Sequence, residues 1–292
     1  MWPVSTIELV DRFQALLHLE STTYRFNNYL LSTNPTYKRN GQFCKDKRYW
    51  RTKTCGWMYH VVDTHHLDRE LVCIAMQYMD MFLSKQTSIR DNAHAFQLVG
   101  MTSLYMAIKI FRTQGKCAAV SSFVKLSKDM FTENDFLNME KSILDTLRWH
   151  MHPPTPQAYL DLLIIFLPRN ACLPYTRRAL VERIKFLLEL SVTVQFFYRK
   201  KPSSIAVAAF IEVMQHEQAP NVSKQSYREH FLHCVRSIAG INVNSEEVVG
   251  CLDAFKVVHK NALRQMNDAV MNERECPESP ASSGRKLRAV TP

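Results

Sequence analysis

Apolar residues recur along most of this chain at the three- and four-residue spacing of amphipathic helices. Residues 1–31 show this pattern first, and a polar link follows at 32–45. From about 47 to 150 one helical pattern succeeds another, until prolines at 153, 154 and 156 interrupt the chain. The pattern then resumes and continues to about residue 262. The sequence therefore predicts helices with short connections throughout.

Two segments are apolar on all sides and rich in small residues. They are 98–110 (LVGMTSLYMAIKI) and 203–211 (SSIAVAAFI), and a helix without a polar face must be buried. Each takes third place among five helical patterns, which indicates a repeat at a spacing of roughly 100 residues. We therefore expect an all-α fold of two tandem five-helix repeats. The expected parts are an N-terminal helix and polar link at 1–44, a first repeat at 45–152, a second at 153–264 and a disordered tail at 265–292.

Local signals mark several helix starts. Ser5 and Thr132 are expected N-caps, and Asp135 lies in the first turn after Thr132, where a carboxylate is favourable. Pro202 is expected at the first position of a helix, because its missing N–H has no partner to lose there.

Composition narrows the class of protein. Only 7 glycines occur in 292 residues, which argues against an all-β fold with many tight turns. The eight cysteines form no CxxC pair, so zinc-ribbon and thioredoxin sites are excluded. Nucleotide-binding and hydrolase glycine motifs are absent, and His60, His65 and His66 lack the HExxH pattern. We therefore expect no enzyme activity, no cofactor, no metal and no membrane span.

The formal net charge of +10 is concentrated between Lys38 and Lys53, which holds seven cations and one acid. One interpretation is a patch for an acidic or phosphorylated partner, and the other is a solvated arm.

Several segments resemble the cyclin family, and their order and spacing are that family's. Residues 57–84 (WMYHVVDTHHLDRELVCIAMQYMDMFLS) resemble the start of a cyclin box, and 96–109 (FQLVGMTSLYMAIK) and 131–149 (FTENDFLNMEKSILDTLRW) resemble its later parts. TPQAYL at 155–160 and YRKKPSSIAVAAF at 198–210 resemble the opening and third helix of a second box. The first box resembles the cell-cycle cyclins of types A, B and D most. The resemblance covers about 45–262 and implies the cyclin fold.

Five signature positions of the family are all present, namely Arg51, Asp80, Leu98, Lys109 and Glu140. Arg51 and Asp80 are expected to form a buried structural ion pair. The resemblance implies that Lys109 and Glu140 reach the backbone of a cyclin-dependent protein kinase, and the alternative is that they pair with each other. The further residues that it implies at a kinase-binding interface are Met106, Ile110, Trp149 and Met151.

The family's substrate-docking patch is degenerate here. Its matching positions are Trp50, Lys53, Thr54, Trp57, His60 and Gln97. Lys53 and Thr54 replace apolar residues and His60 replaces a glutamate, so a hydrophobic groove and its usual charge are both in doubt. Kinase substrates remain possible partners.

The tail contains two candidate proline-directed phosphosites, Ser279 and Thr291, and a basic run at 285–288 that could be a nuclear signal. The resemblance implies a kinase-activating subunit in cell-cycle control, in the nucleus, the cytoplasm or both. A transcription-type cyclin is the alternative. A nucleic-acid-binding protein with cyclin-like repeats is less favoured, since no zinc ribbon precedes the repeats.

Overall fold

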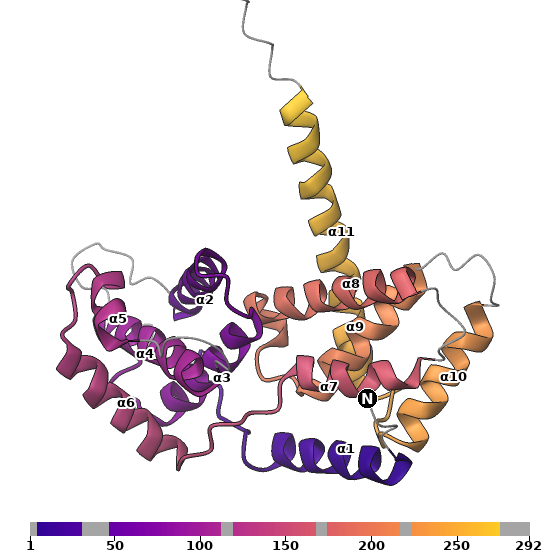
Figure 1. Ribbon diagram of the computed structural model, residues 1–292, viewed down its shortest axis with the longest axis horizontal. Helices are drawn as coiled ribbons and strands as arrows, with labels where there is room; N and C mark the ends of the chain where they lie inside the picture. The colour runs from indigo at the N-terminus through magenta and orange to yellow at the C-terminus, as the bar shows by residue number, and fades with distance from the viewer. Residues whose placement is uncertain (1–4, 31–46, 112–118, 168–173, 217–223, 275–292) are drawn as a thin grey trace, which may run out of the picture.

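All the regular secondary structure of the described residues is helical (Figure 1). A computed structural model describes residues 5–30, 47–111, 119–167, 174–216 and 224–274. The N-terminal helix is α1 (Thr6–Ser21). The first repeat consists of α2 (Lys47–Thr64), α3 (Glu70–Lys85), α4 (Ala93–Phe111), α5 (Val120–Leu126) and α6 (Glu133–Leu147). The second consists of α7 (Pro156–Leu163), α8 (Pro174–Thr193), α9 (Pro202–His216), α10 (Lys224–Ser237) and α11 (Glu246–Arg274), with 3₁₀ turns at Ile164–Phe166 and Gln195–Phe197.

Two separate hydrophobic cores confirm the predicted pair of five-helix repeats. One core joins α2 to α6, and the other joins α7 to α11. The third helix of each repeat, α4 or α9, is central, as its apolar sequence predicts: residues 99–108 and 203–214 are buried without interruption. Gly100 shows why small residues are needed there, because a β-carbon at this position would lie 2.4 Å from Cγ2 of Thr54 on α2.

The capping predictions are confirmed. Ser5 accepts a hydrogen bond from the Glu8 N–H at the start of α1, and Pro202 is the first residue of α9. Thr132 and Asp135 form a reciprocal capping box at the start of α6, which satisfies two backbone donors at once.

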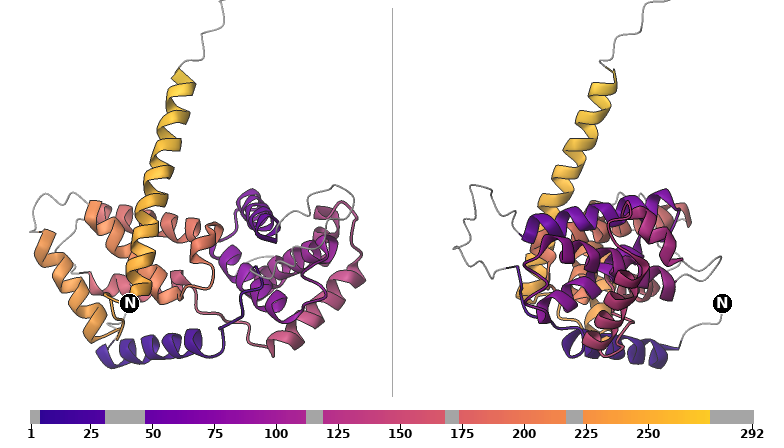
Figure 2. Two further views of the ribbon diagram at one scale, coloured as in Figure 1. Left: turned by 180° about the vertical axis from the view of Figure 1, so that it is seen from behind. Right: turned by 90° about the vertical axis from the view of Figure 1, so that its left-hand side faces the viewer.

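The N-terminal helix belongs to the second core, although it precedes the first repeat in sequence. Leu9 and Phe13 are buried among second-repeat residues, and the Phe13 ring stacks on Phe166 with centroids 5.6 Å apart. Figures 1 and 2 show α1 lying along the second repeat before the chain crosses to the first. The amphipathic pattern predicted the helix, but not the surface that it covers.

The predicted boundary at residue 264 is wrong for the last helix. α11 continues to Arg274 and projects from the body of the molecule (Figure 2). The physical reason is that no glycine or proline occurs between Gly250 and Pro277, so nothing in the backbone ends the helix earlier. Ser279, Thr291, the basic run at 285–288 and residues 38–46 of the basic stretch lie outside the described residues.

Candidate functional site: the end of α4 and α6

The Lys109–Glu140 pair joins the last turn of α4 to the middle of α6. Lys109 Nζ lies 2.8 Å from Glu140 Oε1, and the two side chains are 41% and 12% exposed. The hydrogen bond from Lys109 to Glu140 raises the pKa of the lysine. Nζ also lies 5.4 Å from the centre of the Tyr105 ring. The ammonium is therefore held in place at the surface with its charge retained.

Two of the four apolar residues that the resemblance adds to this site are at the surface. Ile110 is 37% exposed and Trp149 is 71% exposed. Met106 and Met151 are 0% and 6% exposed and belong to the first core, so their expected place at an interface is corrected. The reason is that α6 and its neighbours cover α4 from residue 99 to residue 108, and the helix is exposed again only at Lys109.

The backbone turns Trp149 outward. Arg148 and Trp149 have φ angles of 51° and 62°, in the left-handed region that bulky residues seldom adopt. The Trp149 N–H donates to the Leu144 carbonyl at 3.1 Å, which closes the end of α6. Backbone strain that leaves a large indole in solvent is typical of a residue kept for contact rather than for packing.

Two further exposed apolar residues, one on α6 and one just before it, were not predicted. Leu137 is 48% exposed and lies one turn before Glu140, and Met130 is 50% exposed just before α6. The signal for Leu137 was its three-residue spacing from Glu140, which places both on one face of the helix. We call the group formed by Lys109, Ile110, Leu137, Glu140 and Trp149 the α4–α6 surface.

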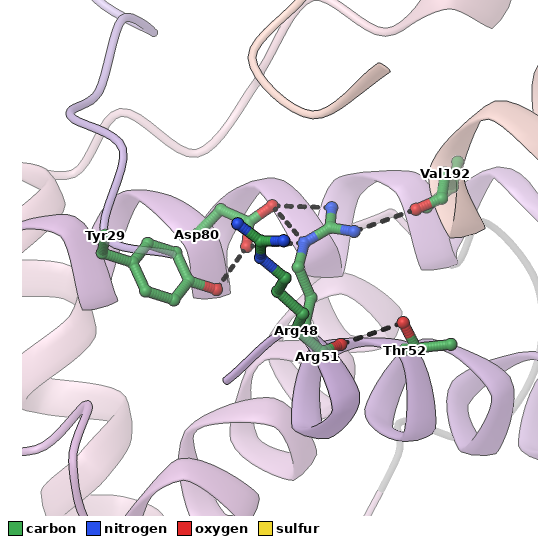
Figure 3. A network of polar contacts seen from close by, with 6 residues as sticks. All are labelled: Tyr29, Arg48, Arg51, Thr52, Asp80 and Val192. Atoms are coloured by element: carbon green, nitrogen blue, oxygen red, sulfur yellow. Dashed lines mark hydrogen bonds and ion pairs between the residues drawn. The ribbon is translucent and has the colours of Figure 1, made fainter. Parts of the chain in front are cut away.

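Arg51 and Asp80 form a buried ion pair between α2 and α3 (Figure 3). Arg51 Nη2 lies 2.9 Å from Asp80 Oδ2, and Nε lies 3.1 Å from Oδ1. Asp80 raises the pKa of Arg51 against the opposing effect of burial. The pair holds the first two helices of the first repeat together.

The same pair also connects the other parts of the molecule. Tyr29, in the segment after α1, donates its hydroxyl to Asp80 Oδ1 at 2.8 Å. Arg51 Nη1 donates to the Val192 carbonyl of α8 at 3.2 Å, and its guanidinium lies 5.1 Å from the Tyr198 ring centre. One ion pair thus joins the N-terminal segment, the first repeat and the second.

The degenerate docking positions lie on α2 and α4, but their apolar members already have contacts. Trp50 packs edge-on against Phe96 with centroids 5.5 Å apart, and Thr54 lies against Gly100. Trp57 is half-buried, whereas Lys53, His60 and Gln97 are exposed. Helix α2 therefore presents a polar face with its indoles partly covered.

The described residues offer little support for a metal site, a membrane span or a reactive cysteine. They contain no group of three or more His, Cys, Asp or Glu residues placed to hold a metal, and His60, His65 and His66 are exposed. None of their helices is both long and apolar enough to span a bilayer. Burial raises the pKa of the Cys55 and Cys251 thiols to about 12, so neither is a ready nucleophile.

Comparison with known proteins identifies the family and agrees with the fold. The family model for the cyclin N-terminal domain matches residues 11–152. "G2/mitotic-specific cyclin-2" of Medicago sativa is 30% identical over 192 residues, covering 66% of this chain and 54% of the relative. "Cyclin-B2-1" of Oryza sativa subsp. japonica is 28% identical over 186 residues, covering 64% of this chain and 41% of the relative. The chain belongs to the cyclin family.

A solved structure supports the fold beyond the matched domain. The X-ray structure of a viral cyclin from herpesvirus saimiri superimposes with a TM-score of 0.58 at 17% identity, covering 86% of this chain and 96% of the viral one. The alignments with the two plant cyclins cover only about half of those proteins.

Proposed function

We propose that this protein is a regulatory subunit that binds and activates a cyclin-dependent protein kinase in cell-cycle control, and that it has no catalytic activity of its own. The observation that carries the proposal is the α4–α6 surface, where a fixed charge pair joins α4 to α6 and an exposed indole follows the end of α6. Its relatives among mitotic cyclins support the cell-cycle assignment. We also propose that it acts in the nucleus, the cytoplasm or both.

The composition of the α4–α6 surface suits protein binding. Interface centres are enriched in tryptophan and poor in unpaired charge, and a few such residues carry most of the binding energy. Trp149 has a large exposed area, and Ile110 and Leu137 add apolar surface on the two helices beside it. The ion pair removes much of the cost of burying Lys109 and Glu140 against a partner.

The internal pair and a kinase contact are compatible. An ammonium has three N–H donors and a carboxylate accepts at about four lone-pair positions. The bond between Lys109 and Glu140 uses one of each, and Tyr105 lies near a second donor. At least one donor and several acceptor positions therefore remain for a partner's backbone. Lys109 and Glu140 can therefore pair with each other and bind a kinase backbone at the same time.

The proposed mechanism is allosteric. Phosphoryl transfer by a protein kinase requires its strand lysine to pair with a glutamate on a mobile helix. A subunit that binds this helix better in its inward position shifts the kinase population toward the active state. The α4–α6 surface supplies positioning and no reacting group.

The proposal is tested by purifying the tagged protein from its own cells and assaying the eluate for protein kinase activity. We expect a kinase to co-purify, and we expect Trp149→Ala and the double variant Lys109→Ala/Glu140→Ala each to lose it. The matched control is Val257→Ala, which truncates a residue that is 60% exposed on the second repeat. A folded protein that recovers no kinase, or variants that recover as much as the wild type, would contradict the proposal.

A further inference from the structure

A cavity of about 200 Å³ lies where the N-terminal segment, the first repeat and the second repeat meet. Its walls come from the end of α1 and the residues after it, from α3, and from the connection between α8 and α9. The buried pair of Arg51 and Asp80 forms part of its lining. The cavity shares no residue with the α4–α6 surface.

Besides Arg51, four cations line this cavity, and we call them the junction cations. Arg25, Arg199 and Lys201 are exposed and Lys200 is half-buried. Lys200 Nζ lies 5.1 Å from the centre of the Phe196 ring, a contact that leaves its charge intact. Within the described residues, none of the four forms an ion pair. Four like charges facing one cavity repel each other unless an anion neutralises them.

Three carboxylates line the same cavity, but the four junction cations and Arg51 outnumber them, so the lining stays positive. Glu20 accepts from the Ser203 hydroxyl at 2.6 Å and from its N–H at 3.1 Å. Asp80 accepts from Arg51 and Tyr29. Glu247 accepts from the backbone N–H of Lys201 at 2.7 Å.

Acidic side chains gather instead in a second cavity, of about 350 Å³. Cys73, Pro156 and Val192 line both cavities, so the two cavities are neighbours that share part of their walls. The carboxylates of the second cavity are those of Asp68, Glu70, Asp161, Glu182 and Glu189. Arg69 and Lys185 also line the second cavity, so carboxylates outnumber cations there, whereas cations outnumber carboxylates in the first.

The backbone fixes the position of Arg199 at the rim. Its φ angle of 67° is left-handed, and its Nε donates to the Phe26 carbonyl at 2.9 Å. The remaining guanidinium nitrogens keep donors available. A guanidinium held in this way has lost much of its freedom before any ligand arrives, which lowers the entropic cost of binding.

We propose that the junction cations bind a phosphorylated serine or threonine of a partner protein. A phosphate monoester carries about −1.5 to −2 charges and three strong acceptor oxygens, which matches a cluster of arginine and lysine better than one carboxylate does. The cavity accommodates a single group on a side chain, whereas nucleic acid is bound along grooves that follow several nucleotides. This inference is independent of the kinase-binding proposal.

The test uses the full chain and a fluorescein-labelled library of nine-residue peptides with a central phosphothreonine. We expect binding by fluorescence anisotropy, and binding weaker by about tenfold or more for the same library with unphosphorylated threonine. Arg25→Gln/Lys201→Gln should reduce binding of the phosphorylated library by a similar factor. Arg199 is left intact because its side chain holds Phe26.

The matched control is Arg228→Gln/Arg236→Gln, which removes two exposed cations from α10 and lowers the net charge equally. We expect it to bind as the wild type does, and circular dichroism verifies that both variants are folded. Three results would overturn the proposal: equal binding of both libraries, equal loss in both variants, or displacement of the phosphopeptides by a single-stranded oligonucleotide at lower concentration than by free phosphothreonine.

Discussion

At the scale of single residues, Asp80 of α3 accepts hydrogen bonds from two other parts of the chain. It bonds to Arg51 on α2 and to Tyr29 in the N-terminal segment, and Arg51 extends the connection to Val192. All three parts of the molecule therefore depend on one buried carboxylate, which is 3% exposed.

Asp80→Ala is expected to lower the free energy of unfolding by about 3–5 kcal/mol, because Arg51 is then left buried without its counter-ion. Tyr29→Phe removes one hydrogen bond to a charged acceptor and should lower it by about 1.5–3 kcal/mol. Urea denaturation followed by circular dichroism measures both. Asp63→Ala, at an exposed carboxylate, is the control and should change stability by less than about 0.5 kcal/mol. An Asp80→Ala variant as stable as this control would show that the network is not structural.

The sequence predicted some of these residues better than others, for physical reasons. A charged residue within a buried helix needs a partner, so the pairing of Arg51 with Asp80 could be anticipated. Met106 could not be placed, because α4 is apolar all round and its pattern does not show which turn emerges from the bundle. Tyr29 and Val192 contribute through segments more than 50 and 140 residues from their partners, which no local pattern reveals.

At the scale of elements, α1 is attached to the second repeat through a buried carboxylate at its last turn. Glu20 is 6% exposed and bonds to Ser203 at the start of α9. Burial raises the pKa of Glu20, and its hydrogen bonds with Ser203 and Tyr159 lower it by less. The native state therefore takes up a proton at Glu20 more readily than the unfolded chain does.

This raised pKa predicts a pH dependence. Because the native pKa lies above the unfolded value of about 4.3, the stabilisation is complete below that value and is lost as the pH rises through the native pKa. Glu20→Gln has no such titration and keeps an acceptor for Ser203. The free energy of unfolding of Glu20→Gln minus that of the wild type should therefore rise between about pH 4.5 and the native pKa, and then level off.

Urea denaturation of both proteins across this pH range measures the difference. Glu8→Gln, on the exposed face of the same helix, tests whether removal of any charge from α1 has this effect. A difference that falls as the pH rises would mean that the bonds to Ser203 favour the ionised form more than burial disfavours it.

The elements themselves follow closely from local patterns, but their placement does not. Ser5, Thr132 and Pro202 mark helix starts because capping depends on the nearest three residues. The docking of α1 on the second core depends on Leu9 and Phe13 meeting residues about 150 positions away. The extent of α11 was underestimated, since polar composition alone does not end a helix that lacks glycine and proline.

At the scale of the whole molecule, the two proposed binding sites share no residues. The α4–α6 surface belongs to the first repeat, whereas the junction cations lie where both repeats meet the N-terminal segment. Their proposed partners are chemically different, one an apolar and hydrogen-bonding kinase surface and the other a phosphate. Variants of the two should therefore act independently, as expected for sites that share no residues.

The proposed function requires that Lys109 and Glu140 bind a kinase as well as each other. The charge-swapped variant Lys109→Glu/Glu140→Lys separates these roles, because it preserves an internal ion pair while exchanging the donors and acceptors that a partner meets. The measurement is kinase activity recovered with the tagged protein from cells, together with thermal unfolding of the purified variant. We predict a melting temperature close to that of the wild type and loss of the kinase. Full recovery of kinase activity by the stable swapped protein would contradict the account.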